Sequence, residues 1–198
     1  RDSKRKEQLV KLTDHMALES LGPAARSLVL RDLPWLGFNR YSDRGMAIEQ
    51  AWESNTKQAL HTTFSDLAKD ELAGWRPSLV FAPMLVEDGR RLLISNLNLA
   101  HLLETAASQR TASGAAPNAI HSLSAVQFYD LFPQAHGSLR LSTSARMNAS
   151  FPYVSPAGVL PTDPPRRVAD AGYYDNYGVN VAAQWLTHLS HQPADPSE

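Results

Sequence analysis

Apolar residues recur at helical spacing through most of the first 75 residues. In residues 4–21, leucines and a methionine share one face while lysines and an aspartate occupy the other, which predicts an amphipathic helix. We expect Gly22-Pro23 to end this helix, because glycine is favoured just past a helix and proline cannot continue it. Residues 43–74 repeat the pattern and predict two further helical pieces. Residues 28–38 are interrupted by proline and glycine and predict irregular structure.

The period of the apolar pattern changes near residue 78. Residues 78–86 are apolar on both faces, as in a strand that is covered on both sides. Asp88-Gly89 separates them from a second apolar run, residues 91–95, and this arrangement predicts a hairpin. Pro83 lies within the first strand, so we expect an edge position or a bulge there.

The second half of the chain alternates short helical and extended segments. Helices are predicted at residues 97–108, after a capping box at Ser124–Gln127, at residues 145–150 behind a cap at Ser142 or Thr143, and at residues 179–190. Ser108–Asn118 predicts a flexible loop, 161–165 a rigid connector, and Arg167–Ala169 a short buried strand that ends at Asp170. Helices that alternate with a few buried strands predict an α/β layered architecture.

The composition narrows the classes of function. The 198 residues are 43% hydrophobic and 20% charged, enough apolar material for one packed domain. The 19 lysines and arginines balance 20 aspartates and glutamates, so we expect no nucleic-acid partner. The absence of cysteine excludes disulfides, cysteine nucleophiles and thiolate metal ligands. No apolar run in the sequence is long enough to span a bilayer.

The stretch 167–178 carries the most informative chemistry. Asp170 follows the predicted buried strand and precedes small residues and a turn, the place where open α/β sheets position reacting groups. An aspartate in such a turn also commonly accepts a hydrogen bond from its own backbone. The spacing favours neither interpretation, so Asp170 is a candidate catalytic residue and equally a candidate turn residue.

Three segments in the correct order resemble the patatin-like lipid acyl hydrolases. The stretch 170–176 is similar to the family's aspartate motif, Asp-Gly-Gly or Asp-Gly-Ala followed by a variable pair and Asn. Residues 141–156 resemble the small-residue helix and Phe-Pro turn before that motif. Residues 78–97, with the turn Asp88-Gly89-Arg90, resemble the family's strand pair with its Thr-Gly-Arg-like hairpin. The similarity extends from about residue 77 to residue 189.

The resemblance implies a lipid acyl hydrolase of the phospholipase A type. Such enzymes use a serine–aspartate dyad without a catalytic histidine, a metal or an organic cofactor. Asp170 matches the dyad aspartate, and Ala171, Gly172 and Asn176 match the residues that shape its turn. The implied substrate is a membrane lipid or another acyl ester, and the implied location is peripheral to a membrane.

The family's nucleophile does not occur in these residues. There is no Gly-x-Ser-x-Gly elbow and no glycine-rich oxyanion loop in the sequence, and the family places both N-terminal to the matched region. We therefore expect them upstream of Arg1 in the same polypeptide. Residues 1–190 are then the C-terminal portion of a single patatin-like catalytic domain, and residues 191–198 a flexible tail.

A second departure is Ala171, which stands where the family has a glycine. If this position needs a positive φ, alanine costs about 1 kcal/mol or more.

The alternative to an enzyme is a catalytically inactive relative that binds lipid or another protein. The sequence upstream of Arg1 separates the two hypotheses, because only the enzyme requires the serine elbow.

Overall fold

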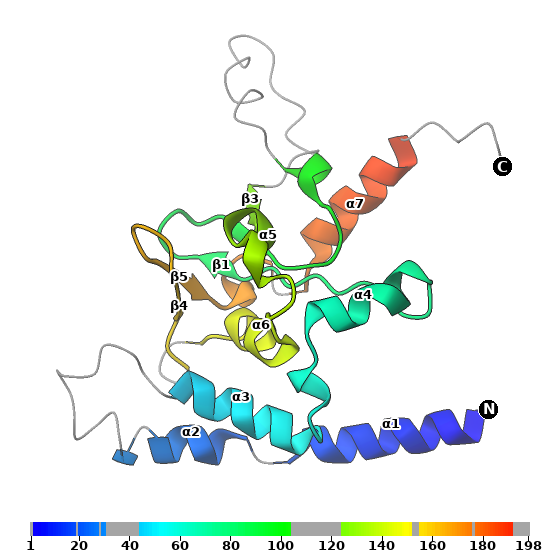
Figure 1. The fold of residues 1–198 in the computed structure, drawn as a ribbon, viewed down its shortest axis with the longest axis vertical. Helices are drawn as coiled ribbons and strands as arrows, with labels where there is room; N and C mark the ends of the chain where they lie inside the picture. The colour runs from blue at the N-terminus through cyan, green and yellow to red at the C-terminus, as the bar shows by residue number, and fades with distance from the viewer. Residues whose placement is uncertain are drawn as a thin grey trace, which may run out of the picture.

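The computed structural model describes residues 2–18, 20–27, 29–30, 44–103, 124–151, 155–175 and 177–191 (Figure 1). The α-helices are α1 (Asp2–Met16), α2 (Leu21–Ser27), α3 (Arg44–Asn55), α4 (Phe64–Leu72), α5 (Phe128–Leu131), α6 (Leu141–Asn148) and α7 (Val179–His191). The strands are β1 (Met84–Leu85), β2 (Arg91–Leu93), β3 (Ala125–Gln127), β4 (Gly158–Leu160) and β5 (Arg166–Ala169). Short 3₁₀ helices include η2 (Ala59–His61), η3 (Ala100–Leu102) and η5 (Ala171–Tyr173).

The five strands form one mixed sheet in the order β3-β2-β1-β5-β4. β1 is antiparallel to both of its neighbours, with Met84 opposite Arg91 in β2 and opposite Ala169 in β5. β3 is parallel to β2, and β4 is antiparallel to β5. It follows that β2, β3 and β5 run in one direction, so their carboxyl ends lie at the same end of the sheet.

Helices pack on both faces of the sheet. Leu92 of β2 enters the larger core, where it packs with Phe64 of α4 and Val168 of β5 and with residues of α5 and α6. The next residue, Leu93, enters a second core with Leu102 of η3 and Val181 of α7. Because successive strand residues point to opposite faces, the two cores cover opposite faces of the sheet. The α/β class predicted from the sequence is therefore confirmed, as a mixed fold with one five-stranded sheet.

Several local predictions are confirmed. Residues 43–74 form two helical pieces, and the second begins with a capping box in which Thr63 and Asp66 bond each other's backbone N–H groups. Asp88-Gly89 turns the β1–β2 hairpin, with Gly89 at φ +70°. Arg167–Ala169 is part of β5, and residues 179–190 form α7.

Two helix-boundary predictions are wrong. The first helix ends at Met16, and Gly22 and Pro23 lie in the first turn of α2, where a proline loses no intrahelical hydrogen bond. Ser142 and Thr143 do not cap α6; the helix begins at Leu141, and both hydroxyls bond glutamates of α3.

The predicted capping box at Ser124–Gln127 and the predicted edge or bulge at Pro83 are also wrong. The capping-box pattern Ser124–Gln127 precedes α5 but forms β3, since Ser124 accepts the Arg91 N–H and the next three residues pair with β2. Pro83 marks neither an edge nor a bulge, because β1 has a neighbour on each side and Pro83 precedes its two residues. The Pro83 carbonyl still accepts the Leu92 N–H.

Other predictions are only partly covered. Within residues 97–108, the described portion forms η3 alone. Residues 161–165 join β4 to β5, and β4 itself was not predicted. The predicted loop Ser108–Asn118 and the tail after His191 lie outside the described residues.

A polar contact fixes α6 against α3. Glu53 of α3 is 7% exposed, and its Oε1 accepts a hydrogen bond of 2.6 Å from the buried Ser142 hydroxyl. One turn earlier in α3, Glu49 forms an ion pair with Arg146 and accepts a hydrogen bond from the Thr143 hydroxyl. These bonds position α6. Ser150, two residues after the end of α6, bonds the candidate site described next.

Candidate functional site

Asp170 lies directly after β5, at the end of the sheet where β2 and β3 also finish. Its N–H donates to the Ser150 carbonyl at 3.1 Å, which ties the turn to the end of α6. Its carbonyl accepts the Tyr173 N–H at 3.3 Å. The predicted position, a carboxylate at the carboxyl end of a buried strand, is where the structure places it.

The two carboxylate oxygens of Asp170 have different surroundings. Oδ1 accepts the Gly172 N–H, so the side chain caps the short helix η5. Oδ2 has no hydrogen-bond partner among the described residues. The side chain is half-buried, so solvent or a reacting group can reach it. The turn interpretation therefore holds for one oxygen, while the other is available as a proton acceptor.

The turn residues named from the motif have separate roles. Ala171 is 6% exposed and packs inside η5, and it is not among the residues with positive φ. The glycine-to-alanine departure therefore carries no backbone strain here. Gly172 supplies the N–H for Asp170, and Asn176 lies outside the described residues.

Asp175 caps the last helix. Its Oδ1 accepts the Val179 N–H and its Oδ2 accepts the Asn180 N–H, both at 3.0 Å. A carboxylate at this position satisfies two of the N–H groups that the first turn of α7 leaves unbonded and also suits the helix dipole. Asp175 is thus a structural residue.

We expect Asp175→Ala to lower the free energy of unfolding by about 1 kcal/mol, the usual cost of losing a side chain that bonds the free N–H groups at the start of a helix. Urea unfolding followed by far-UV circular dichroism measures this change. Thr187→Ala on the same helix is the control, because Thr187 lies near the other end of α7, where its hydroxyl bonds the Ala183 carbonyl. Equal stability of Asp175→Ala and the parent protein would contradict the capping role.

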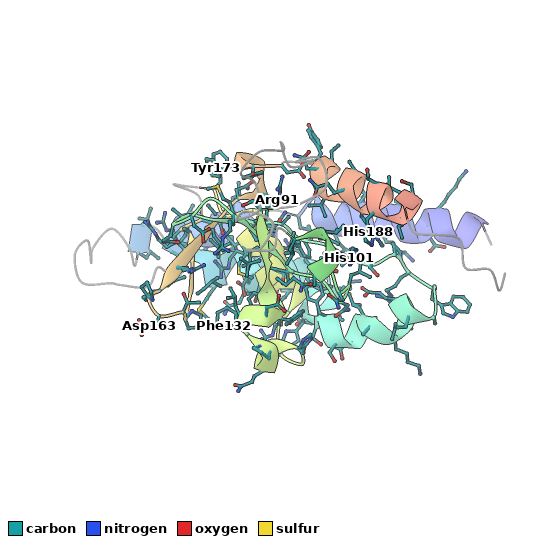
Figure 2. The ribbon with its side chains drawn as sticks, turned by 90° about the horizontal axis from the view of Figure 1, so that it is seen from above. Arg91, His101, Phe132, Asp163, Tyr173 and His188 are labelled. Carbon is teal, nitrogen blue, oxygen red and sulfur yellow. The ribbon has the colours of Figure 1, made fainter. Side chains whose placement is uncertain are left out.

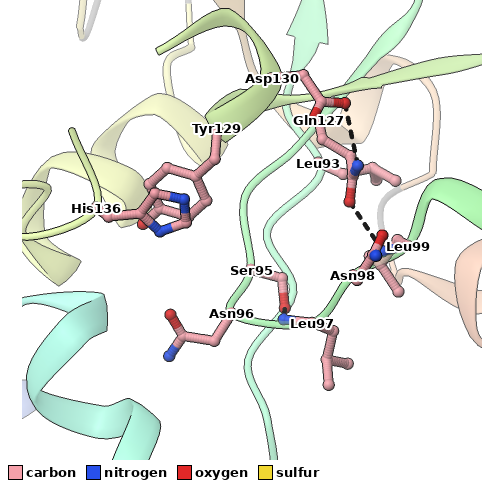
Figure 3. A pocket seen from close by; sticks show the side chains of 10 residues that line it. All are labelled: Leu93, Ser95, Asn96, Leu97, Asn98, Leu99, Gln127, Tyr129, Asp130 and His136. Atoms are coloured by element: carbon pink, nitrogen blue, oxygen red, sulfur yellow. Dashed lines mark hydrogen bonds between the residues drawn. The ribbon is translucent and has the colours of Figure 1, made fainter. Parts of the chain in front are cut away.

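A cavity of about 230 Å³ opens beyond the carboxyl ends of β2 and β3 (Figure 3). Leu93 and Leu99 line one side of the cavity. Tyr129 and His136 line the other side, with their stacked ring centres 3.7 Å apart. Gln127 bridges the polar wall, donating to Asp130 at 3.0 Å and accepting the Leu99 N–H at 2.8 Å.

This cavity was not predicted from the sequence, because its walls come from two segments more than 25 residues apart. The available signal was the polar run Ser95-Asn96 directly after an apolar strand. Ser95 accepts the Leu97 N–H and makes no bond to a basic side chain among the described residues. Burial raises the pKa of Tyr129 to about 12, so its phenol is protonated at neutral pH. The cavity can bind a small polar group but holds no activated nucleophile within the described part.

Histidines do not form a metal centre in the described part of the chain. His101 of η3 and His188 of α7 lie with ring centres 4.1 Å apart (Figure 2), and burial together with the charge of His188 lowers the pKa of His101. Among the residues described, no three histidine or carboxylate side chains lie close enough together to hold a metal ion.

The comparisons with known proteins add no assignment. None of the helices described is long and apolar enough to cross a membrane. No family model matches the chain, and neither a curated protein nor a solved structure matches it.

Proposed function

We propose that this chain supplies the aspartate of a serine–aspartate dyad that hydrolyses lipid acyl esters, as the resemblance to patatin-like hydrolases implies. The observation that carries the proposal is the Asp170 carboxylate. It lies at the carboxyl end of β5, is held by its own backbone and by Gly172, and keeps Oδ2 without a partner among the described residues. The expected nucleophile is a serine upstream of Arg1.

The chemistry assigned to Asp170 is general-base catalysis. A serine hydroxyl is a weak nucleophile until a positioned base accepts its proton. Oδ2 accepts that proton as the serine oxygen attacks the ester carbonyl, and it returns the proton to the departing alcohol when the ester C–O bond breaks. A water molecule that gives a proton to Oδ2 then attacks the acyl-enzyme, and the proton passes to the serine oxygen as the free acid leaves. The bond from Gly172 to Oδ1 fixes the carboxylate, so little reorganisation is needed during the transfer.

Exposed aromatic residues beside Asp170 support a lipid substrate and a peripheral membrane location. The rings of Phe151 and Tyr173 stack with their centres 5.9 Å apart, and both residues are more than half exposed. Tyr177 is 87% exposed. Exposed apolar surface of this kind marks interaction sites, and tyrosine suits the boundary between water and lipid.

The second candidate is a non-catalytic module that binds lipid or protein through the same surface. The hydrogen bond from Gly172 to Asp170 favours it, because a turn aspartate needs no catalytic role. The two candidates differ in whether a reactive serine exists in the full-length polypeptide.

We expect a fluorophosphonate probe to label the full-length polypeptide stoichiometrically and to leave residues 1–198 expressed alone unlabelled. The reason is that the proposed nucleophile lies upstream, and the serines with described side chains that are fully buried, such as Ser142 and Ser144, bond to a carboxylate or to a backbone carbonyl. Intact-mass spectrometry and hydrolysis of phospholipid vesicles measure the outcome. Labelling of the 198-residue chain would place the nucleophile within it, and an unlabelled full-length polypeptide would favour the binding module.

A further inference from the structure

Arg91 is a buried cation within the sheet. It is the first residue of β2 and is 4% exposed. Leu93, two residues later in the same strand, packs in the core under α7, so the Arg91 side chain lies on this same face of the sheet. Figure 2 shows Arg91 beside the turn that carries Tyr173, and its guanidinium carbon lies 3.9 Å from the ring centre of Tyr174.

Arg91 forms no ion pair with any described residue, in contrast to six other arginines of the chain. Those six pair with carboxylates and have side chains that are 16–59% exposed. The Nε–H of Arg91 is buried and has no acceptor in the described part of the structure. A buried charge without a partner is strongly unfavourable, and a bound anion at this position would offset that cost.

The contact with Tyr174 does not remove this requirement. A cation–π contact uses the flat face of the guanidinium, whereas its five N–H bonds point outward in the plane of the group. The ring therefore covers one face and leaves the N–H edge, including Nε–H, for an acceptor. Tyr174 is 45% exposed, so its side chain can rotate into solvent and admit a ligand.

We propose that Arg91 anchors an oxyanion-binding site beside the Asp170 turn. The ligand is a carboxylate or a phosphoryl group, because both present two oxygens at the spacing of the guanidinium fork and accept two parallel hydrogen bonds. Tyr173 lies on this turn, and its ring stacks on that of Phe151, which follows α6; together they provide apolar surface for the rest of an amphiphilic anion. This binding site does not depend on the proposed hydrolysis.

The test uses the full-length polypeptide and isothermal titration calorimetry. The probes are decanoate and glycerol 3-phosphate, each compared with its uncharged counterpart, decanol or glycerol. We expect at least one anion to bind and the alcohols to bind at least tenfold more weakly. Arg91→Met should weaken the anion about tenfold or more, since it removes the charge-assisted bonds. Arg91→Lys keeps the charge without the planar fork and should give an intermediate affinity.

A thermal melt separates ligand binding from a structural role. Arg91→Met should melt at or above the temperature of the parent protein without ligand, because an apolar side chain of similar length replaces an unpaired buried charge. Tyr174→Phe, which keeps the ring, should bind the anion like the parent protein. Decanoate binding alone identifies a carboxylate ligand, and glycerol 3-phosphate binding alone a phosphoryl ligand. Failure of both anions to bind, unchanged anion affinity in Arg91→Met, or a lower melting temperature of that variant would overturn the proposal.

Discussion

Asp170→Asn should reduce ester turnover by the full-length polypeptide by about 10²–10⁴-fold, the range that a general base contributes. The amide oxygen can still accept the Gly172 N–H, so the turn is retained. The asparagine NH2 group, which replaces Oδ2, cannot accept the serine proton. We therefore expect kcat for a soluble acyl ester to collapse while the melting temperature changes little.

Asp175→Asn is the matched control for this experiment. It lies five residues further along the same turn region, and its oxygens bond the α7 backbone. Asparagine keeps one of the two acceptor oxygens, and Asp175 does not touch the proposed reacting atoms, so most of the turnover should survive. Near-normal turnover in Asp170→Asn would show that Asp170 is a turn residue and would remove the dyad from the proposed mechanism.

The elements predicted correctly from the sequence depend on local signals. Asp88-Gly89 forms its hairpin because the glycine adopts φ +70°, which the turn requires and glycine allows. The helix at 64–72 begins at a capping box whose two partners are three residues apart. β5 and α7 also follow from hydrophobic period alone, and this was sufficient to place Asp170 at a strand end.

The elements predicted incorrectly depend on partners distant in the sequence. Ser124–Gln127 matches a capping box, but a parallel strand more than 30 residues earlier takes its backbone hydrogen bonds, and β3 forms instead. Pro83 suggested an edge because a local pattern does not reveal that Ala169 pairs with the next residue. The cavity behind Gln127 and the unpaired Arg91 arise in the same way, from packing between separate segments.

Glu53→Ala should give a large loss of stability. The carboxylate is 7% exposed and joins α3 to α6 through Ser142 and to η2 through His61 at 3.1 Å. Its removal leaves the buried Ser142 hydroxyl without this acceptor, while Arg140 and His61 are about half exposed and regain water. We expect a cost of about 2 kcal/mol, the range for a hydrogen bond to a charged group. For a domain of this size, the melting temperature should fall by about 4–8 °C.

The pH dependence of this effect identifies the charge. Burial alone raises the pKa of Glu53, but hydrogen bonds from Ser142 and His61, the charge of a protonated His61 and the charge of Arg140 outweigh it, so the pKa lies below its ordinary value of 4.5. The ionised carboxylate therefore stabilises the fold fully above about pH 4.5, and this contribution is lost as the pH falls through the lower folded-state pKa. Glu53→Gln keeps the shape and an acceptor oxygen without the charge. Urea unfolding at pH 7 and at successive steps below pH 4.5 should show the stability gap between the parent protein and Glu53→Gln closing as the pH falls. A gap that stays constant over this range would mean that Ser142 and His61 require only an acceptor at this position and that the charge contributes nothing to holding α3 against α6.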